Sequence, residues 1–216
     1  MRRNLVIEVF VTEAALSRFG PILADAPVHV VTDRAAKALS DTVTPVGLVA
    51  VCQLPSTNLA DVLADQPRLV AVAAEISEPG NAGTLIRIAD AMGADAVLLA
   101  GNSVDPYNGK CLRASAGSIF AVPVVTESDA GEALSALRSA GLQVLATTVD
   151  GEVSLDDVDL SGPTAWLFGP ESRGLPAELA TSAGHRVRIP MSGGAESLNV
   201  AAAAAICLYA TQLAQT

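Results

Sequence analysis

From residue 69 onward, short apolar runs alternate with segments of helical pattern, and this alternation constrains the fold more than any other feature. The apolar runs are "LVAVAAE" at 69–75, "DAVLLAG" at 95–101, "QVLATT" at 143–148, "TAWLFG" at 164–169 and "HRVRIPM" at 185–191. Such runs predict strands that are buried on both faces. Helices are predicted at about 82–92, 129–140 and 198–214. The pattern therefore predicts an α/β fold in which helices cover both faces of a parallel sheet.

The first 54 residues have the pattern of a smaller α/β unit. Its predicted strands and helices alternate along the chain: strands at 4–12, 28–32 and 46–53, and helices near 13–24 and 34–40. Residues 55–68 contain Pro, Ser and Asn and are typical of a linker, although "LADVLAD" can form one or two helical turns. We therefore predict a small domain at 1–54, a linker at 55–68 and a larger domain at 69–216.

Composition argues against several classes of protein. The longest apolar run, "VAAAAAICLYA", has about 11 residues, whereas a helix that spans a bilayer needs about 20. The first residues lack the apolar core of a secretory signal, so we expect a cytoplasmic protein without a membrane segment. Cys52, Cys111 and Cys207 are odd in number and far apart in the sequence. They indicate neither a disulfide framework nor a metal site.

The net charge of −10 argues at first against a nucleic-acid partner. However, many of the acidic residues fall between positions 127 and 159. Basic residues such as Arg87, Lys110, Arg113 and Arg173 instead lie close to Gly-containing segments. The local charge there can be positive, so the total charge excludes little.

Three Gly-containing segments follow predicted strands, at 78–83, 169–175 and 192–199. Ligands of open parallel sheets bind at the carboxyl ends of the strands, so these segments are candidates for one site. A dinucleotide site is disfavoured because "PGNAGTLIR" lacks the G-x-G-x-x-G pattern. A serine hydrolase is also a poor fit, since G-x-S-x-G is missing and neither His29 nor His185 lies in a motif.

Each polar residue in these segments also has an ordinary structural interpretation. Asn81, Ser197 and Asn199 can cap helices, and Glu171 can cap a helix or pair with a nearby Arg. Arg87 can be a solvated side chain paired with Asp90 three residues later, which contributes only a few tenths of a kcal/mol.

Taken together, the three segments form an ordered set of motifs. They read N-x-G-x-x-x-R from Asn81 to Arg87, then G-x-E-x-x-G-L from Gly169 to Leu175, then I-P-M followed by S-L-N-V from Ile189 to Val200. This set resembles the three signature motifs of the SpoU (TrmH-like) family of RNA 2′-O-ribose methyltransferases, in the SPOUT superfamily. "DPYNGKCLRASAGSIFAVPV" at 105–124 is similar to the segment between the first two motifs. The resemblance covers about 70–215, with a weaker match over 4–54.

The resemblance implies a fold, a cofactor and an assembly. The fold would contain a C-terminal trefoil knot, with a small N-terminal domain that binds the RNA substrate. Family members with such a domain usually begin with a further strand and helix, so either the domain is shortened here or the start of the sequence is cut short. The cofactor would be S-adenosylmethionine, with Gly169, Ile189, Met191 and Leu198 at the cofactor-contacting positions. The enzyme would be a homodimer, and the apolar last helix, with Ala204 and Leu208, would face the partner.

The resemblance also assigns roles in catalysis. Arg87 matches the residue that acts on the ribose hydroxyl, either as a base or as an electrostatic guide through the neighbouring phosphate. The other polar positions of the family's site are matched by Asn81, Glu171, Ser197 and Asn199. The implied activity is methyl transfer to a ribose 2′-hydroxyl, with ribosomal RNA favoured over transfer RNA because basic terminal extensions are missing. The alternative from another class is a non-catalytic protein that binds RNA or the ribosome.

Overall fold

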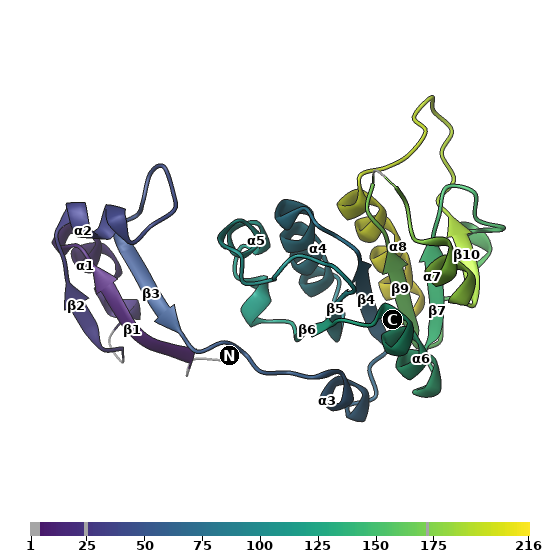
Figure 1. Cartoon of the computed structure of the whole chain (residues 1–216), viewed down its shortest axis with the longest axis horizontal. Coiled ribbons are helices and arrows are strands. Elements are labelled where there is room, and N and C mark those ends of the chain that lie inside the picture. Colours follow the sequence, from purple (N-terminus) through teal and green to yellow (C-terminus); the bar gives the residue numbers. More distant parts are fainter. Residues whose placement is uncertain (1–4, 24–25, 172) are drawn as a thin grey trace. The chain divides into compact units, whose positions relative to one another are not determined.

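The computed structural model describes residues 5–23, 26–171 and 173–216 (Figure 1). The chain divides between Ser56 and Thr57 into two compact units. Each unit has its own sheet, of three strands in the first unit and seven in the second.

The first unit is built around β1 (Val6–Val11), which lies between the other two strands. Strand β2 (Val28–Val30) pairs with it in parallel and β3 (Leu48–Cys52) pairs with it antiparallel. Val9 and Val11 of β1 pack against Ala15 of helix α1 (Glu13–Phe19), because alternate residues of a strand share one face. This cluster is the core of the small unit.

Both α-helices of the first unit begin at a threonine that caps them. The side chains of Thr12 and Thr32 accept hydrogen bonds from the backbone N–H groups of Ala15 and Ala35, at the starts of α1 and of α2 (Asp33–Ala38). The strands and helices predicted here are present, but α1 is shorter than 13–24. It gives way to the 3₁₀ turn η2 (Gly20–Ile22), because Pro21 has no N–H to donate. Residue 24 lies outside the described residues.

The second unit contains a sheet in which every strand runs parallel to its neighbours. The order of the strands across the sheet is β6-β5-β4-β9-β7-β10-β8. Their bounds are β4 (Leu69–Ala74), β5 (Ala96–Ala100), β6 (Val124–Glu127), β7 (Gln143–Thr147), β8 (Val153–Ser154), β9 (Thr164–Phe168) and β10 (His185–Arg188). The predicted parallel α/β class is confirmed.

Helices lie on both faces of this sheet (Figure 1). They are α3 (Leu59–Ala64), α4 (Pro79–Ala91), α5 (Gly109–Ser115), α6 (Ala130–Ser139), α7 (Ala177–Ser182) and α8 (Val200–Ala214), with 3₁₀ turns η3 (Ser118–Phe120) and η4 (Leu155–Asp157). Ala71 and Ala73 of β4 share a core with α4, α5 and α8, whereas Val70 and Val72 share the opposite core with α3 and α6. Because β4 is buried on both faces, it is apolar at every position.

Several elements differ from the sequence predictions. Helix α4 begins at Pro79 rather than near residue 82, because Glu78 caps it by accepting from the N–H of Gly80. The interpretation of Asn81 as its N-cap is therefore wrong. Asn199 does cap α8, through a hydrogen bond from the N–H of Ala201. Strands β6 and β8 and helices α5 and α7 were not predicted.

The segment expected to be a linker contains the short helix α3, whose Leu59 and Val62 are buried in the core of the second unit. Asn58 caps this helix by accepting from the N–H of Asp61. The assignment of 55–68 as a linker between two domains stays a prediction, as does the trefoil knot.

Candidate active site

The three motif segments lie at the carboxyl ends of three strands of the seven-stranded sheet. The segment that begins with Glu75 follows β4, the segment that begins with Gly169 follows β9, and the segment that begins with Ile189 follows β10. A fourth segment, 148–152, follows β7, which lies between β9 and β10 in the sheet. Because all four strands are parallel, the four segments meet at the same end of the sheet. This end is formed by the carboxyl ends of the strands, and we call it the carboxyl edge.

A cavity of about 550 Å³ opens at this edge, and we call it the edge cavity. Its size is within the range of small-molecule and cofactor sites. The four positions implied as cofactor contacts, Gly169, Ile189, Met191 and Leu198, all line it. So do Glu171 and Ser197 from the implied catalytic set. The remaining lining residues are Thr147, Thr148, Val149, Asp150, Pro170, Arg173, Gly174, Leu175, Val187, Glu196, Val200 and Ala203.

The shape of the second motif depends on its two glycines. A Cβ atom on Gly169 would lie 2.6 Å from the backbone nitrogen of Leu175, so only glycine fits where this loop folds back on itself. Gly174 has a φ of +65°, which other residues adopt with strain. The fold-back places Leu175 in the wall of the edge cavity and leaves Glu171 at its mouth.

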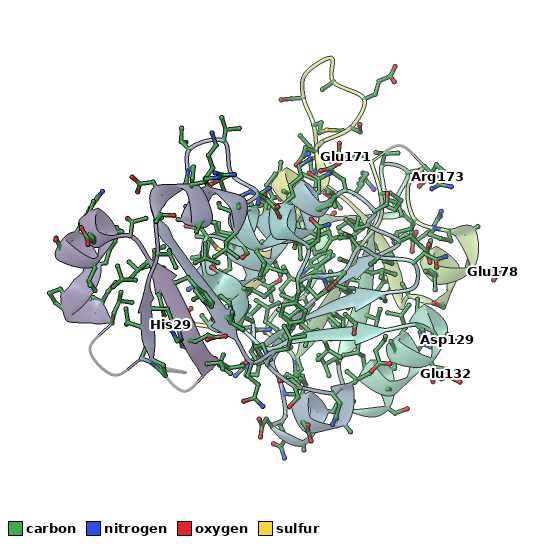
Figure 2. The ribbon with its side chains drawn as sticks, turned by 60° about the vertical axis from the view of Figure 1, so that its left-hand side comes forward. His29, Asp129, Glu132, Glu171, Arg173 and Glu178 are labelled. Carbon is green, nitrogen blue, oxygen red and sulfur yellow. The ribbon has the colours of Figure 1, made fainter. Side chains whose placement is uncertain are left out.

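The carboxylate of Glu171 connects all three motifs. Its Oε1 accepts hydrogen bonds from Nδ2 of Asn81 at 2.8 Å, from Nδ2 of Asn199, and from the backbone N–H of Val200 at 3.2 Å. Nδ2 of Asn199 also lies 3.4 Å from Oδ1 of Asn81. We call Asn81, Glu171 and Asn199 the Glu171 network. Figure 2 shows Glu171 close to the loop that precedes α8.

The Glu171 network fixes the loops that surround the edge cavity. A charged acceptor strengthens each hydrogen bond relative to a neutral one, and the bond to Val200 satisfies a free N–H in the first turn of α8. Because Glu171 itself is exposed, the network contributes little to global stability. Its main effect is to hold residues from α4, the β9 loop and the start of α8 in one arrangement.

A second carboxylate holds the start of α4. Oε1 of Glu78 accepts from the N–H of Gly80 at 3.1 Å and from Nζ of Lys110 on α5 at 2.5 Å. The hydrogen bond from Lys110 is the main reason that the pKa of Glu78 is lowered, and the bond from Gly80 adds to it. Neither residue was predicted as part of the site, because their positions 32 residues apart give no sequence signal. Together they tie the first motif to α5.

Arg87 lies apart from the Glu171 network. It is six residues beyond Asn81 on α4, about 9 Å further along the helix axis, and it does not line the edge cavity. Its side chain is exposed. Among the described residues it has no hydrogen bond or salt bridge, so the alternative pairing with Asp90 is not formed.

The predicted site residue Ser197 and the basic residue Arg173 have no hydrogen bond or salt bridge among the described residues. Ser197 is exposed at the mouth of the edge cavity. Arg173, in the second motif, lines the cavity and is also exposed (Figure 2). Neither forms a hydrogen bond or salt bridge within the described part of the chain, so Arg173 does not pair with Glu171. Both remain available to a ligand.

The described residues contain no helix that is long and apolar enough to cross a membrane. Within the same ranges there is no group of three or more His, Cys, Asp or Glu residues that could hold a metal ion.

These features define a parallel α/β protein with a ligand cavity at the carboxyl edge of its sheet and a network of three motifs beside it. Comparison with known proteins identifies the family. The sequence model of the SpoU rRNA Methylase family matches residues 68–209, and the chain belongs to this family.

Individual relatives agree with this assignment. The chain is 36% identical over 181 residues to the 23S rRNA (guanosine(2553)-2′-O)-methyltransferase RlmP of Bacillus subtilis, covering 84% of this chain and 71% of that protein. It is also 36% identical over 170 residues to the 23S rRNA (uridine(2479)-2′-O)-methyltransferase of Streptomyces viridochromogenes, covering 76% of this chain and 59% of the relative. The crystal structure of the SpoU methyltransferase AviRb from Streptomyces viridochromogenes, in complex with AdoMet, matches with a TM-score of 0.83 and 30% identity, over 96% of this chain and 82% of that chain.

Proposed function

We propose that this protein transfers a methyl group from S-adenosylmethionine to a ribose 2′-hydroxyl of ribosomal RNA. The observation that carries the proposal is the Glu171 network, in which one carboxylate joins residues of three separate motifs at the mouth of the edge cavity. The relatives named as 23S rRNA 2′-O-methyltransferases support the same reaction and substrate.

The edge cavity fits the cofactor on its own chemistry. Its volume of about 550 Å³ suits a nucleoside with an amino-acid tail. Leu175, Val187, Ile189 and Leu198 provide apolar wall for the base, and charged residues stand among the other lining residues. We assign cofactor contacts to Gly169, Ile189, Met191 and Leu198. When bound, S-adenosylmethionine supplies an activated methyl group.

The protein's own residues must position the ribose hydroxyl and help it lose its proton. Glu171 holds the side-chain amides of Asn81 and Asn199 in place beside the edge cavity. Ser197, which is exposed and lines the same cavity, contributes a hydroxyl group. Arg87 attracts the phosphate beside the target ribose. An arginine side chain stays protonated in proteins, and a protonated group cannot take up a proton as a base. The role of electrostatic guide is therefore favoured.

Arg87 would reach the site in a homodimer. Within one chain it stands on the exposed side of α4, away from the edge cavity. Helix α4 packs against α8, which exposes Ile206, Tyr209 and Leu213 at 39%, 51% and 58%. Their spacing of three and four residues places them in one stripe. A partner docked on this stripe would bring Arg87 of the partner subunit towards the cavity.

The expected positions of Ala204 and Leu208 at such an interface are wrong. Both side chains are 0% exposed and belong to the core that α8 shares with α4 and the sheet. A charge at either position would therefore disrupt the fold of a single chain rather than test its assembly.

The first unit is proposed to bind the RNA substrate, and the second to hold the cofactor and carry out transfer in the cytoplasm. The acidic residues of α6 and α7, including Asp129, Glu132 and Glu178 (Figure 2), would repel a phosphate backbone. RNA would instead approach the side of Arg87, Lys110 and Arg113 on the packed helices α4 and α5.

The test is to compare 2′-O-methylated positions in cellular RNA with and without this gene. The proposal requires one ribosomal RNA position to lose its methyl group and to regain it when the wild-type gene is restored. Loss at a transfer RNA position would favour the alternative substrate. No change in any RNA, together with retained RNA binding, would favour the non-catalytic alternative.

A further inference from the structure

Thr148, a residue that lines the edge cavity, carries a buried hydroxyl group without a hydrogen-bond partner among the described residues. Oγ1 of Thr148 is the one side-chain nitrogen or oxygen, among the described residues, that is buried and lacks a hydrogen bond. Thr148 directly follows β7 and lines the edge cavity. A buried hydroxyl without a partner costs stability, so it requires an explanation such as a bound ligand, an ordered water or a functional role.

The surrounding backbone fixes this residue firmly. The N–H of Thr148 donates to the carbonyl of Val187 on β10 at 3.0 Å, which continues the pairing between β7 and β10. The preceding Thr147 has a different use, because its Oγ1 donates to the carbonyl of Leu167 on β9 at 3.0 Å. The hydroxyl of Thr147 therefore links β7 to β9 through a hydrogen bond. The hydroxyl of Thr148, in contrast, has no hydrogen-bond partner among the described residues.

We propose that Thr148 is a specificity residue for the cofactor and that its hydroxyl forms a hydrogen bond with the edge of the adenine base. This inference rests on the proposed function, in which the cavity holds S-adenosylmethionine. A hydroxyl both donates and accepts, so it can pair with a ring nitrogen or with the exocyclic amine of adenine.

The surroundings of Thr148 favour the base over the amino-acid tail as the partner of its hydroxyl. Oγ1 of Thr148 is inaccessible to solvent, and the buried Val187 lies beside it in the wall. The exposed charged residues Asp150, Arg173 and Glu196 also line the cavity. An apolar enclosed wall suits a flat aromatic base, whereas a charged tail is better placed near exposed charges.

Thr148→Val replaces the hydroxyl with a methyl group of similar shape and separates ligand recognition from stability. We expect its affinity for S-adenosylhomocysteine, measured by calorimetry, to fall about tenfold, as the loss of one buried hydrogen bond predicts. The free variant should melt at the wild-type temperature or above it, because the unpaired hydroxyl is gone. Thr148→Ser should keep the affinity. Thr181→Val is the matched control, since that hydroxyl bonds the carbonyl of Ala177 on α7, outside the cavity.

Binding of 5′-methylthioadenosine, which lacks the amino-acid tail, tests the assignment to the base. The same loss in Thr148→Val with this shorter ligand supports the adenine contact, whereas a loss that disappears overturns it. Unchanged affinity of Thr148→Val for both ligands would also overturn the inference, as would a lower melting temperature of the free variant. A wild-type protein that binds neither ligand would instead refute the proposed function.

Discussion

At the scale of single residues, the site depends on one exposed carboxylate. Glu171 receives three hydrogen bonds on the same oxygen, from the side chains of Asn81 and Asn199 and the backbone of Val200. Each bond is near solvent and contributes modestly to stability. Their combined effect is to fix the geometry of the site. This matters because a displacement of catalytic groups by about 1 Å can lower the rate of the catalysed reaction strongly.

Replacement of Glu171 by Ala should therefore affect catalysis far more than stability. Methyl transfer is expected to fall by about two orders of magnitude or more, while the free energy of unfolding changes by less than about 1 kcal/mol. Single-turnover transfer and thermal unfolding measure the two effects. Glu178→Ala, which removes an exposed carboxylate on α7, is the control and should change neither. Equal rates in the two variants would contradict the role of the network.

Arg87 gives a second test at this scale. Arg87→Ala should lower methyl transfer at least about a hundredfold, or about 2.7 kcal/mol of transition-state stabilisation. Affinity for the cofactor should hardly change, because Arg87 does not line the edge cavity. Arg87→Lys should be almost as slow if a phosphate is held by the planar guanidinium.

The matched control for Arg87 is Asp90→Ala on the same helix. If Arg87 acted only as a solvated partner of Asp90, the two variants would behave alike. The account predicts a wild-type rate for Asp90→Ala and a slow rate for Arg87→Ala. A wild-type rate for Arg87→Ala would show that Arg87 is an ordinary surface residue without a role in methyl transfer.

Sequence reasoning found the residues of the site only in part. The ordered motifs led to Asn81, Glu171 and Asn199, but not to their common hydrogen bonds, because Asn81 and Glu171 are 90 residues apart. Glu78 was overlooked as a cap, since a Ser, Thr, Asp or Asn is the usual signal. Thr148 was not predicted because it lies outside the three motif segments at 78–83, 169–175 and 192–199. The rule that ligands bind at the carboxyl ends of strands would have included it.

At the scale of elements, the sequence predicted the long buried strands, but it did not predict several of the short strands and helices. Strands β4, β5 and β9 are buried at every position, and runs that are wholly apolar, or apolar after a first Thr as in β9, indicate such strands directly. Strand β8 has only two residues and is held by its pairing with β10. Its local sequence therefore contains no pattern that predicts a strand. Helix α7 has six residues and no side-chain cap, which removes the usual start signal.

The contact between α4 and α5 depends on Gly83 and provides a prediction about stability. A Cβ atom at this position would lie 2.4 Å from the carbonyl oxygen of Cys111 and 2.7 Å from Cβ of Ala114. Gly83→Ala should therefore lower the free energy of unfolding by about 1–3 kcal/mol, as overpacking does, despite the better helix propensity of Ala. Chemical denaturation measures the change.

Gly131→Ala on α6 is the control for Gly83. Its added Cβ would have only the cap oxygen of Asp129 within 4 Å, at 3.3 Å. This variant should be close to neutral or slightly more stable. Equal stability of the two variants would contradict the close approach of α4 and α5.

At the scale of the whole molecule, the proposed reaction needs two chains to complete one site. The exposed stripe of Ile206, Tyr209 and Leu213 predicts the interface. Ile206→Glu should shift the protein towards monomers and lower activity with it, because a charge at an apolar interface is costly. Sedimentation at assay concentration and methyl transfer report the two effects.

Ala214→Glu is the control for assembly, since Ala214 is exposed on α8 and lies neither three nor four residues from any member of the stripe. It should leave both the assembly and the rate unchanged. A wild-type protein that is fully active as a monomer would contradict the shared site, and Arg87 would then need another route to the substrate.

The most direct test of the central claim is a single turnover with S-adenosylmethionine that carries a labelled methyl group. The wild-type protein is mixed with 23S ribosomal RNA, and the RNA is then digested to nucleosides. The account predicts label on the ribose 2′-oxygen of one nucleoside, with Glu171→Ala at least about a hundredfold slower. Label on a base, or equal rates for the wild type and Glu171→Ala, would contradict it.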